Sequence, residues 1–547
     1  MIRLVSFILV VFFFSVIPSF ADGLCGTARI LENLKNQGKT LRQLLYQKPL
    51  AQTDISSCTA SDLYDSVYTK KTEHFEIFYT LDGPHQTTTE FIDSLVNTLE
   101  YTWNFHVRKS GMRAPIGGSE TYQYQKTTTT GLYPVEVLDI DLLRNTKSIL
   151  NGVCHGCYGL TFPFDSTRSE LMIDNDFRFT PLTNAQIDST HFHGKNCPYT
   201  VATEPLVNTT YGYSYAERWI NAIRITAAHE LYHAIQLRYL DMFSYINLWY
   251  EASAVGMENV IYSEVNDYIA YLREASESVG TPLDKMDNDY GASPLFLYLY
   301  NHVGRDTDKL IWESFARQPN RPFQDHLAKA VSKRKLSSDS LFHDFATRLA
   351  FAGRRSSLVD SSFWIDRDQP LWSDYRINAQ SGNFSVRSID SLAFQFYSNG
   401  TPDLGHFTGK TSAIALNKHS YKVRFLPTTN SVDSVRVEFA NEADLDSVIW
   451  ITSRFSESEI TPTTISDSTL RAYPTPWRHG LLCFTPLPQG KKHLEIRNRR
   501  GNLIEKIPYD SSTLCLDENK VKSMLVPGVY RFRAGNNGKT KDFIVIY

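Results

Sequence analysis

Two histidines four residues apart, His229 and His233, enclose a glutamate, Glu230, in the stretch ITAAHELYHAIQLRYL. On an α-helix, residues four apart lie one above the other on one face, so both imidazoles can point at one ion. Glu230 then lies beside that ion, where its carboxylate can take a proton from a metal-bound water. The HExxH spacing therefore predicts a metal site. Zinc suits it, because zinc accepts tetrahedral nitrogen and oxygen ligands with a fourth position left to water.

The third ligand must come from another element. A downstream helical stretch, NLWYEASAVGMENVIY, offers two carboxylates, Glu251 and Glu258. The first helix is expected to run to about Leu240, and the chain to reverse across residues 241–246. Along the second helix, which runs back beside the first, Glu251 comes nearly level with the metal held by His233. Glu258 lies roughly 8 Å beyond that level. We therefore predict Glu251 as the third ligand and expect Glu258→Ala to keep zinc.

The alternative to a metal site is a buried helix whose histidines are satisfied by neighbouring side chains. An HExxH pattern also occurs by chance, so the motif alone is only suggestive. The stretch contains no Gly or Pro, which favours an uninterrupted helix. The carboxylate at Glu251 is the additional feature that favours zinc over the buried-helix interpretation.

The preceding segments predict the elements that would position this helix. In EHFEIFYTLDG, residues 73–83, Phe75, Ile77 and Tyr79 alternate as in a strand. TTEFIDSLVNTLEYTWNFHV has helical spacing, and VEVLDIDLL and ELMIDNDF predict further strands. The pattern remains helical to about Leu349. These elements predict an α+β domain that contains the histidines.

Three stretches together, TAAHELYHAIQ, WYEASAVGMEN and YGASPLFLYLYNHVG, resemble exported bacterial metalloproteases of the glutamate-zincin (thermolysin-like) type. The resemblance covers roughly residues 70–350 and implies a zincin-like catalytic domain, which we place at residues 70–355. It implies a secreted zinc endopeptidase that acts on a protein or peptide substrate. In that activity Glu230 is the general base, because it accepts the proton of the attacking water.

The developing oxyanion also needs a hydrogen-bond donor. Tyr290, in DNDYGASPLF, precedes a helix start much as the catalytic tyrosine does in related aminopeptidase-like zincins, so we select it as the catalytic donor. The alternative is that Tyr290 only packs. For the whole protein, the alternative function is a catalytically inactive zincin-like protein used for surface adhesion or carbohydrate binding.

The N-terminus predicts export. Arg3 precedes an apolar run over residues 4–17, and small residues precede Asp22, so residues 1–21 read as a signal peptide. This run is too short to span a bilayer comfortably, and no later segment is long and apolar enough. We expect a secreted or cell-surface protein without a stable membrane span. The net charge of −3 gives no reason to expect a nucleic-acid partner.

A chain of 547 residues is too long for one ordinary core, and we expect roughly three or four domains. Residues 22–69 predict an N-terminal helical segment or prosegment. Short alternating runs over residues 356–465 predict a β-sandwich domain. The Ser/Thr-rich stretch SESEITPTTISDST predicts a linker, and residues 466–547 predict a C-terminal β-domain.

The C-terminal domain carries a second resemblance. YPTPW, LEIRNRRGNLIEKI and the final MLVPGVYRFRAGNNGKTKDFIVIY are similar to the sorting domain of type IX secretion. That resemblance implies the type IX secretion machinery as a partner. The alternative is a terminal carbohydrate-binding or adhesive β-domain.

Export favours disulfides for the seven cysteines. Cys25 with Cys58, and Cys483 with Cys515, are the expected pairs. Three other cysteines lie near three histidines, namely Cys154, Cys157, Cys197, His155, His191 and His193. For this group we favour one disulfide and one free thiol over a second metal site, because its spacing matches no standard ligand pattern.

Overall fold

The structure is a computed structural model in which most of the chain beyond residue 65 is described. The described residues are 66–140, 156–165, 167–179, 190–192, 195–199, 204–205, 207–208, 212–240, 247–286, 289–319, 321–404, 407–417, 422–425, 447–456, 471–473, 482–485, 487, 492–498, 502–510, 513–534 and 541–545. The predicted signal peptide, nearly all of the N-terminal segment and nearly all of the linker lie outside these ranges. The chain divides into two compact units, residues 1–458 and 459–547, which are treated separately below.

The first unit begins with a six-stranded mixed sheet. Its strands are β1 (Tyr68–Lys71), β2 (Phe75–Tyr79), β3 (Ile116–Gly117), β4 (Tyr133–Leu138), β5 (Gly159–Pro163) and β6 (Arg168–Asp174). The order is β1-β2-β4-β6-β3, with β5 paired to β6. Neighbours among β2, β4, β6 and β3 run parallel, whereas β1 and β5 pair antiparallel with β2 and β6.

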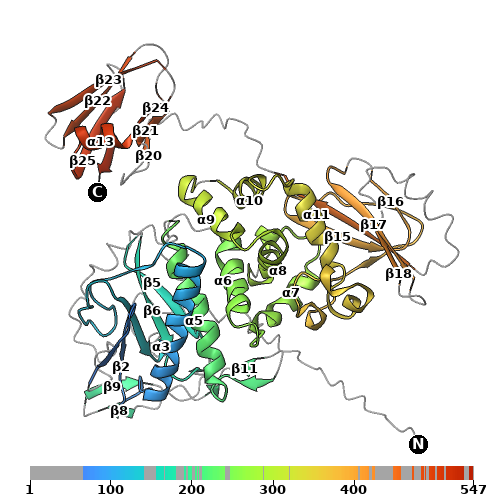
Figure 1. The fold of residues 1–547 in the computed structure, drawn as a ribbon, viewed down its shortest axis with the longest axis horizontal. Coiled ribbons are helices and arrows are strands. Elements are labelled where there is room, and N and C mark those ends of the chain that lie inside the picture. The colour runs from blue at the N-terminus through green and yellow to red at the C-terminus, as the bar shows by residue number, and fades with distance from the viewer. Residues whose placement is uncertain are drawn as a thin grey trace, which may run out of the picture. The chain divides into compact units, whose positions relative to one another are not determined.

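Two helices pack side by side on one face of this sheet (Figure 1), α3 (Thr89–Trp103) and α5 (Trp219–Gln236). Thr88 caps α3 by accepting the backbone N–H of Phe91. The helix predicted here from its spacing buries one apolar face, which includes Phe91, Leu95 and Leu99. Helix α5, which carries the HExxH residues, ends at Gln236 rather than at Leu240, and the chain continues as a turn.

The other face of the sheet carries buried carboxylates. Successive residues of a strand point to opposite faces. Thr161 in β5 reaches Glu230 on α5 and pairs with Leu171 in β6, so Glu170 points away from α5. There Glu170 and its neighbour Glu136 in β4 accept backbone N–H groups of residues 122–124. The segment after β3 is thereby fixed across the far face.

A helical layer follows the sheet domain. Its helices are α6 (Asn247–Ile261), α7 (Leu272–Glu277), α8 (Ser293–Tyr298), α9 (Thr307–Arg317), α10 (Phe323–Ser332) and α11 (Ser338–Leu349). Short 3₁₀ or π segments are Asn104–Lys109, Asp267–Tyr271, Leu283–Lys285, Asp289–Ala292, Leu299–Val303, Gly353–Leu358, Ser361–Phe363 and Gln369–Leu371. The expected combination of a mixed sheet with packed helices is confirmed, so the protein is a multidomain α+β protein.

A second sheet of five strands completes the first unit. Its strands are β13 (Asn378–Ala379), β15 (Ala393–Ser398), β19 (Ser447–Arg454), β17 (Lys410–Asn417) and β18 (Lys422–Phe425), in that order. Helix α11 packs on β17 and β19, where His343 contacts the hydroxyls of Ser412 and Ser453. Four short strand pairs are β7 (Arg178–Phe179) with β10 (Glu204–Pro205), β8 (Thr190–Phe192) with β9 (Lys195–Tyr199), β11 (Val207–Asn208) with β12 (Tyr213–Ser214), and β14 (Asn383–Ser385) with β16 (Thr401–Asp403).

The second unit has its own core and two sheets. One sheet contains β20 (Arg471–Tyr473), β21 (Leu482–Thr485) and β24 (Leu514–Leu516), and the other contains β23 (Leu503–Tyr509), β22 (Lys492–Asn498), β25 (Gly528–Ala534) and β26 (Lys541–Val545). Helix α13 (Glu518–Met524) is capped by Asp517. Leu494, Ile496 and Phe532 are central to the buried core. Most of YPTPW lies outside the described residues.

The cysteines agree in part with the predictions. Cys483 and Cys515 face each other on β21 and β24 and form the expected disulfide. Cys157 is also disulfide-bonded. Cys25, Cys58 and Cys154 lie outside the described residues, as do His155, His193 and the side chains of His191 and Cys197. Among the helices that the structure describes, none has the length and apolarity required to cross a bilayer.

Candidate metal centre

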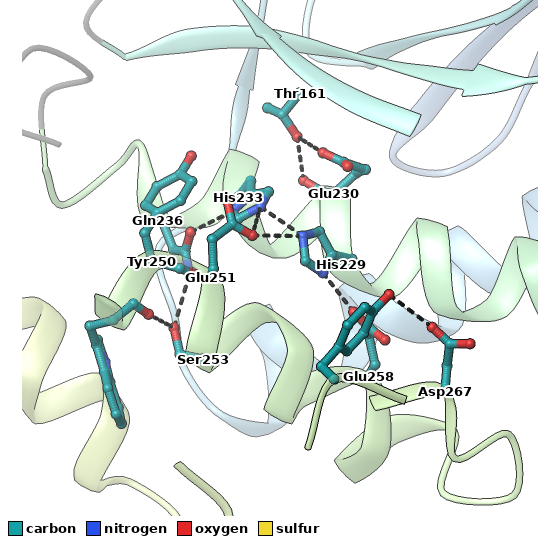
Figure 2. A network of polar contacts seen from close by, with 12 residues as sticks. Thr161, His229, Glu230, His233, Gln236, Tyr250, Glu251, Ser253, Glu258 and Asp267 are labelled. Carbon is teal, nitrogen blue, oxygen red and sulfur yellow. Dashed lines mark hydrogen bonds and ion pairs between the residues drawn. The ribbon is translucent and has the colours of Figure 1, made fainter. Parts of the chain in front are cut away.

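Three predicted ligand atoms converge in the interior of the first unit (Figure 2). His229 Nε2 lies 2.9 Å from His233 Nε2, and Glu251 Oε2 lies 3.2 Å from the first and 3.4 Å from the second. Tetrahedral zinc with bonds of about 2.0–2.1 Å separates its ligand atoms by roughly 3.3 Å. The three atoms therefore lie close enough together to bind one metal ion.

Two packed helices bring these atoms together. On α5 the histidines are one turn apart on the same face, and α6 returns beside α5 to supply Glu251. Helix α8 packs closely on α6 at Gly256, where a Cβ would lie 2.1 Å from Phe296 Cδ1. Glycine thus permits the close approach that supports α6 from behind.

His233 is oriented by a chain of polar contacts. Its Nδ1 lies 2.7 Å from Gln236 Oε1, while Gln236 Nε2 donates to the carbonyl of Tyr250 and the hydroxyl of Ser253. Because Gln236 Nε2 is occupied as a donor, its Oε1 accepts the Nδ1–H of His233. The Tyr250 ring stacks on the imidazole with centroids 4.2 Å apart. This leaves the Nε2 lone pair of His233 for a metal ion.

His229 is oriented by Glu258, whose Oε1 lies 2.6 Å from Nδ1. Burial raises the pKa of Glu258, although the bond to His229 opposes that shift. From the sequence, Glu258 was expected to lie beyond the level of His233 along α6. Glu258 does lie beyond the place where the three candidate ligand atoms converge. There its carboxylate contacts Nδ1 of His229, which is one turn before His233 on α5. It is a positioning residue for a candidate ligand, so its removal is expected to weaken rather than abolish metal binding.

Glu251 has the environment of a metal ligand. Its side chain is 2% exposed, and apart from the two imidazole contacts neither oxygen has a hydrogen-bond partner among the described residues. Burial alone would raise the pKa of Glu251, but His233 and His229 outweigh burial and lower it to about 2. An ionised carboxylate in the interior requires a compensating charge. The donor set, two imidazoles and one such carboxylate, fits a divalent cation.

Glu230, the predicted base, lies buried beside this group. Thr161 in β5 contacts both the backbone oxygen of Glu230, at 2.7 Å, and its carboxylate Oε2, at 2.9 Å. Strand β5 thus holds the glutamate against the sheet. The base predicted from the sequence is therefore held against β5, one residue from a candidate metal ligand.

Tyr290, the predicted oxyanion donor, also lies at the centre. Its ring centroid is 5.9 Å from that of His229 and 4.9 Å from that of Tyr271. The preceding residue, Asp289, has its pKa raised to about 7 by burial and then by the charge of Glu251. The structure therefore brings all five predicted site residues into one neighbourhood.

A second group of potential ligands lies at the surface. Glu73, His74 and Glu100 have ligand atoms within 4.8 Å of one another. Glu100 accepts bonds from Thr72 and from both the backbone and the ring of His74, and Glu73 pairs with Arg108. These protein partners account for the group without a metal ion.

Sequence reasoning missed several residues of the centre. Thr161 and Asp267 come from distant segments, and no local signal identified them. Gln236 and Tyr250 did carry a signal, because each lies within three residues of a predicted ligand. A residue close to a metal-binding histidine on a helix is a natural candidate for the bond to its second nitrogen.

Comparisons with known proteins add little. No protein-family model matches the chain, and no curated protein sequence matches it. One solved structure, of PorZ, an essential bacterial surface component of the type-IX secretion system of Porphyromonas gingivalis, is 17% identical over 18% of this chain. That match spans 14% of the PorZ chain with a TM-score of 0.13. An overlap this small defines neither the fold nor the function of this chain.

Proposed function

We propose that the protein is a secreted zinc-dependent endopeptidase. The observation that supports this function is the convergence of His229, His233 and a poorly hydrogen-bonded Glu251, with Glu230 adjacent. A metal site with three protein ligands and an open fourth position is typical of catalytic rather than structural zinc.

Each residue of the site has a separate role in the proposed hydrolysis. Zinc bound at this centre would polarise the scissile carbonyl and acidify a water molecule. Glu230 accepts the proton of the attacking water and then delivers it to the leaving amine. Thr161 donates to Oε2 of Glu230 and so fixes the carboxylate plane. Tyr290 donates its hydroxyl to the negative oxygen that develops on the substrate.

Hydrolysis with and without a chelator tests this function. The purified protein is incubated with casein and with a peptide library, as isolated, after chelation and after zinc is restored. We expect cleavage that chelation abolishes and zinc restores. Zinc binding without cleavage of any substrate would instead support the inactive adhesion or carbohydrate-binding protein.

We also infer that the second unit directs secretion. It is a separate compact unit with its own core and a disulfide, as expected of a domain that reaches an oxidising compartment. If it is a type IX sorting domain, intact mass spectrometry of the mature extracellular protein should show a mass that lacks these residues. A full C-terminus on that protein would favour an adhesive or carbohydrate-binding domain.

A further inference from the structure

A small pocket, with about 20 Å³ of enclosed space and an opening to solvent, adjoins the candidate metal centre. His229 and Glu230 form part of its lining, so a group bound there lies next to the reacting atoms. The far side is formed by Asp267 and Tyr271, the two ends of a 3₁₀ segment. Thr226, one turn before Glu230 on α5, also lines it. The pocket is a candidate for the site that selects the substrate residue beside the cleaved bond.

The lining of this pocket is strongly acidic. It includes the carboxylates of Glu230, Glu258 and Asp267, and among the described residues that line it none is Lys or Arg. The field of these acids extends to the neighbouring tyrosines. Burial first, and then the charges of Asp267 and Glu258, raise the pKa of Tyr158 and Tyr271 well above its ordinary range.

Asp267 has a carboxylate that is held in a fixed position. The hydroxyl of Tyr215 donates to one carboxylate oxygen, and the hydroxyl of Tyr271 donates to the other at 3.3 Å. Two such donors stabilise the ionised form of a buried carboxyl group. Glu258 is similarly fixed by His229. Neither carboxylate needs to reorganise to meet a cation.

Thr226 provides an independent indication of a polar ligand. Thr226 is 4% exposed, and its Oγ1 has no hydrogen-bond partner in the part of the chain that the structure describes. The methyl group packs toward β5, where a Cβ on Gly159 would lie 2.6 Å from Thr226 Cγ2. A buried hydroxyl without a partner is costly, and a ligand N–H would satisfy it.

We propose that this pocket binds a cationic group of the peptide substrate, so that cleavage occurs next to that group. The inference rests on the proposed peptidase function. An ammonium carries three donors and a guanidinium five, which match carboxylates and a hydroxyl that can accept them. The cation comes either from a lysine or arginine side chain or from the free N-terminal amine of the peptide.

Matched peptides test the proposal. An internally quenched peptide carries lysine, arginine, norleucine or glutamate at one position, with a free or an acetylated N-terminus, and mass spectrometry locates the cleaved bond. We expect cleavage next to lysine or arginine with a kcat/KM at least roughly tenfold above that of the norleucine peptide. Loss of cleavage on acetylation, with no dependence on the side chain, assigns the pocket to the N-terminal amine.

Two variants link the preference to the pocket. Asp267→Asn removes the fixed charge with little change in shape, and Thr226→Val removes only the hydroxyl. Each should lower the ratio of kcat/KM between the cationic and neutral peptides. Glu264→Gln is the matched control, because Glu264 is exposed, pairs with Arg224 and precedes Asp267 by three residues. It should leave the ratio unchanged.

A measurement of peptide binding tests the cation pocket independently of the proposed peptidase activity. Calorimetry with the chelator-treated wild-type protein measures the affinity for the lysine and norleucine peptides without turnover and with all three pocket carboxylates in place. Tighter binding of the lysine peptide supports the pocket even if no hydrolysis is found. Equal affinity for the two peptides, or a cationic preference that survives both pocket variants, overturns it.

Discussion

Two buried carboxylates of the first unit illustrate different ways of placing an acid in a protein interior. Glu136, on the far face of the sheet, accepts backbone N–H groups of Gln123 and Tyr124 at 3.0 and 2.6 Å. Glu251, between α5 and α6, faces only two imidazoles and has no other hydrogen-bond partner among the described residues. Both are almost fully buried. The difference lies in what compensates them.

The direction of each pKa shift follows from this difference. Burial raises the pKa of Glu136, and the backbone donors only partly oppose it, so the protein can carry this group as a neutral acid. At Glu251 the imidazoles lower the pKa despite burial, so the charge remains. A buried acid that accepts backbone bonds has a structural explanation. Protonated imidazoles can compensate the charge of Glu251, and a metal ion can take the place of their protons, which makes this group a candidate metal site.

Glu230 is a third kind of buried acid, because its proposed role is to exchange a proton. Glu230→Gln preserves the shape and removes the acceptor. Turnover should fall by roughly 10²–10⁴-fold while zinc stays bound. Steady-state kinetics and metal analysis of the same preparation measure both. Activity within about tenfold of wild type would exclude Glu230 as the base.

Asp308 tests whether acids satisfied by protein donors behave as Glu136 does. It is buried at the start of α9, accepts bonds from Tyr232 and Trp249, and has its pKa raised to about 7, mainly by burial. An unfolded aspartate releases its proton near pH 4, so between pH 4 and 7 the folded state binds more protons and stability falls as pH rises. The loss is of the order of 4 kcal/mol.

The corresponding measurement is chemical denaturation at several pH values, with Asp308→Asn as the comparison. The difference in unfolding free energy between the two proteins should change steadily from pH 4 to pH 7 and then level off. A constant difference across that range would show that Asp308 is already ionised in the folded state.

Glu258 lies between the two cases, because it contacts His229, a candidate metal ligand, but does not belong to the group of three converging side chains. Glu258→Gln should weaken zinc binding by about 10–100-fold, since it replaces the acceptor that orients His229. Competition with a chromophoric chelator measures the affinity. Glu264→Gln, an exposed acid near the end of α6, should have no effect. Equal affinities in both variants would remove the positioning role.

Much of this centre followed from local spacing. The four-residue separation on α5 and the return of α6 placed His229, His233 and Glu251 correctly, because helix geometry is regular over short distances. The contact between Glu258 and His229 was not predicted. The helix lengths were compared at His233 alone, although His229 lies about 6 Å farther along the antiparallel α5.

The remaining features required the tertiary fold. Thr161 reaches Glu230 only because β5 pairs with β6 beneath α5, and strand pairing of this kind has no signature in the sequence of either partner. Asp267 approaches the centre through a 3₁₀ segment after α6. The acids Glu136 and Glu170 interrupt strands that otherwise read as apolar, and their backbone donors come from an irregular loop. Periodicity predicted the elements but not these contacts.

Zinc content after dialysis tests the contrast between the two carboxylates most directly. Wild-type protein, Glu251→Ala and the matched Glu136→Ala are loaded with zinc, dialysed and checked for folding by circular dichroism. We predict about one zinc per chain in the wild type and in Glu136→Ala, and almost none in Glu251→Ala. A folded Glu251→Ala protein that retains as much zinc as the wild type would contradict the account.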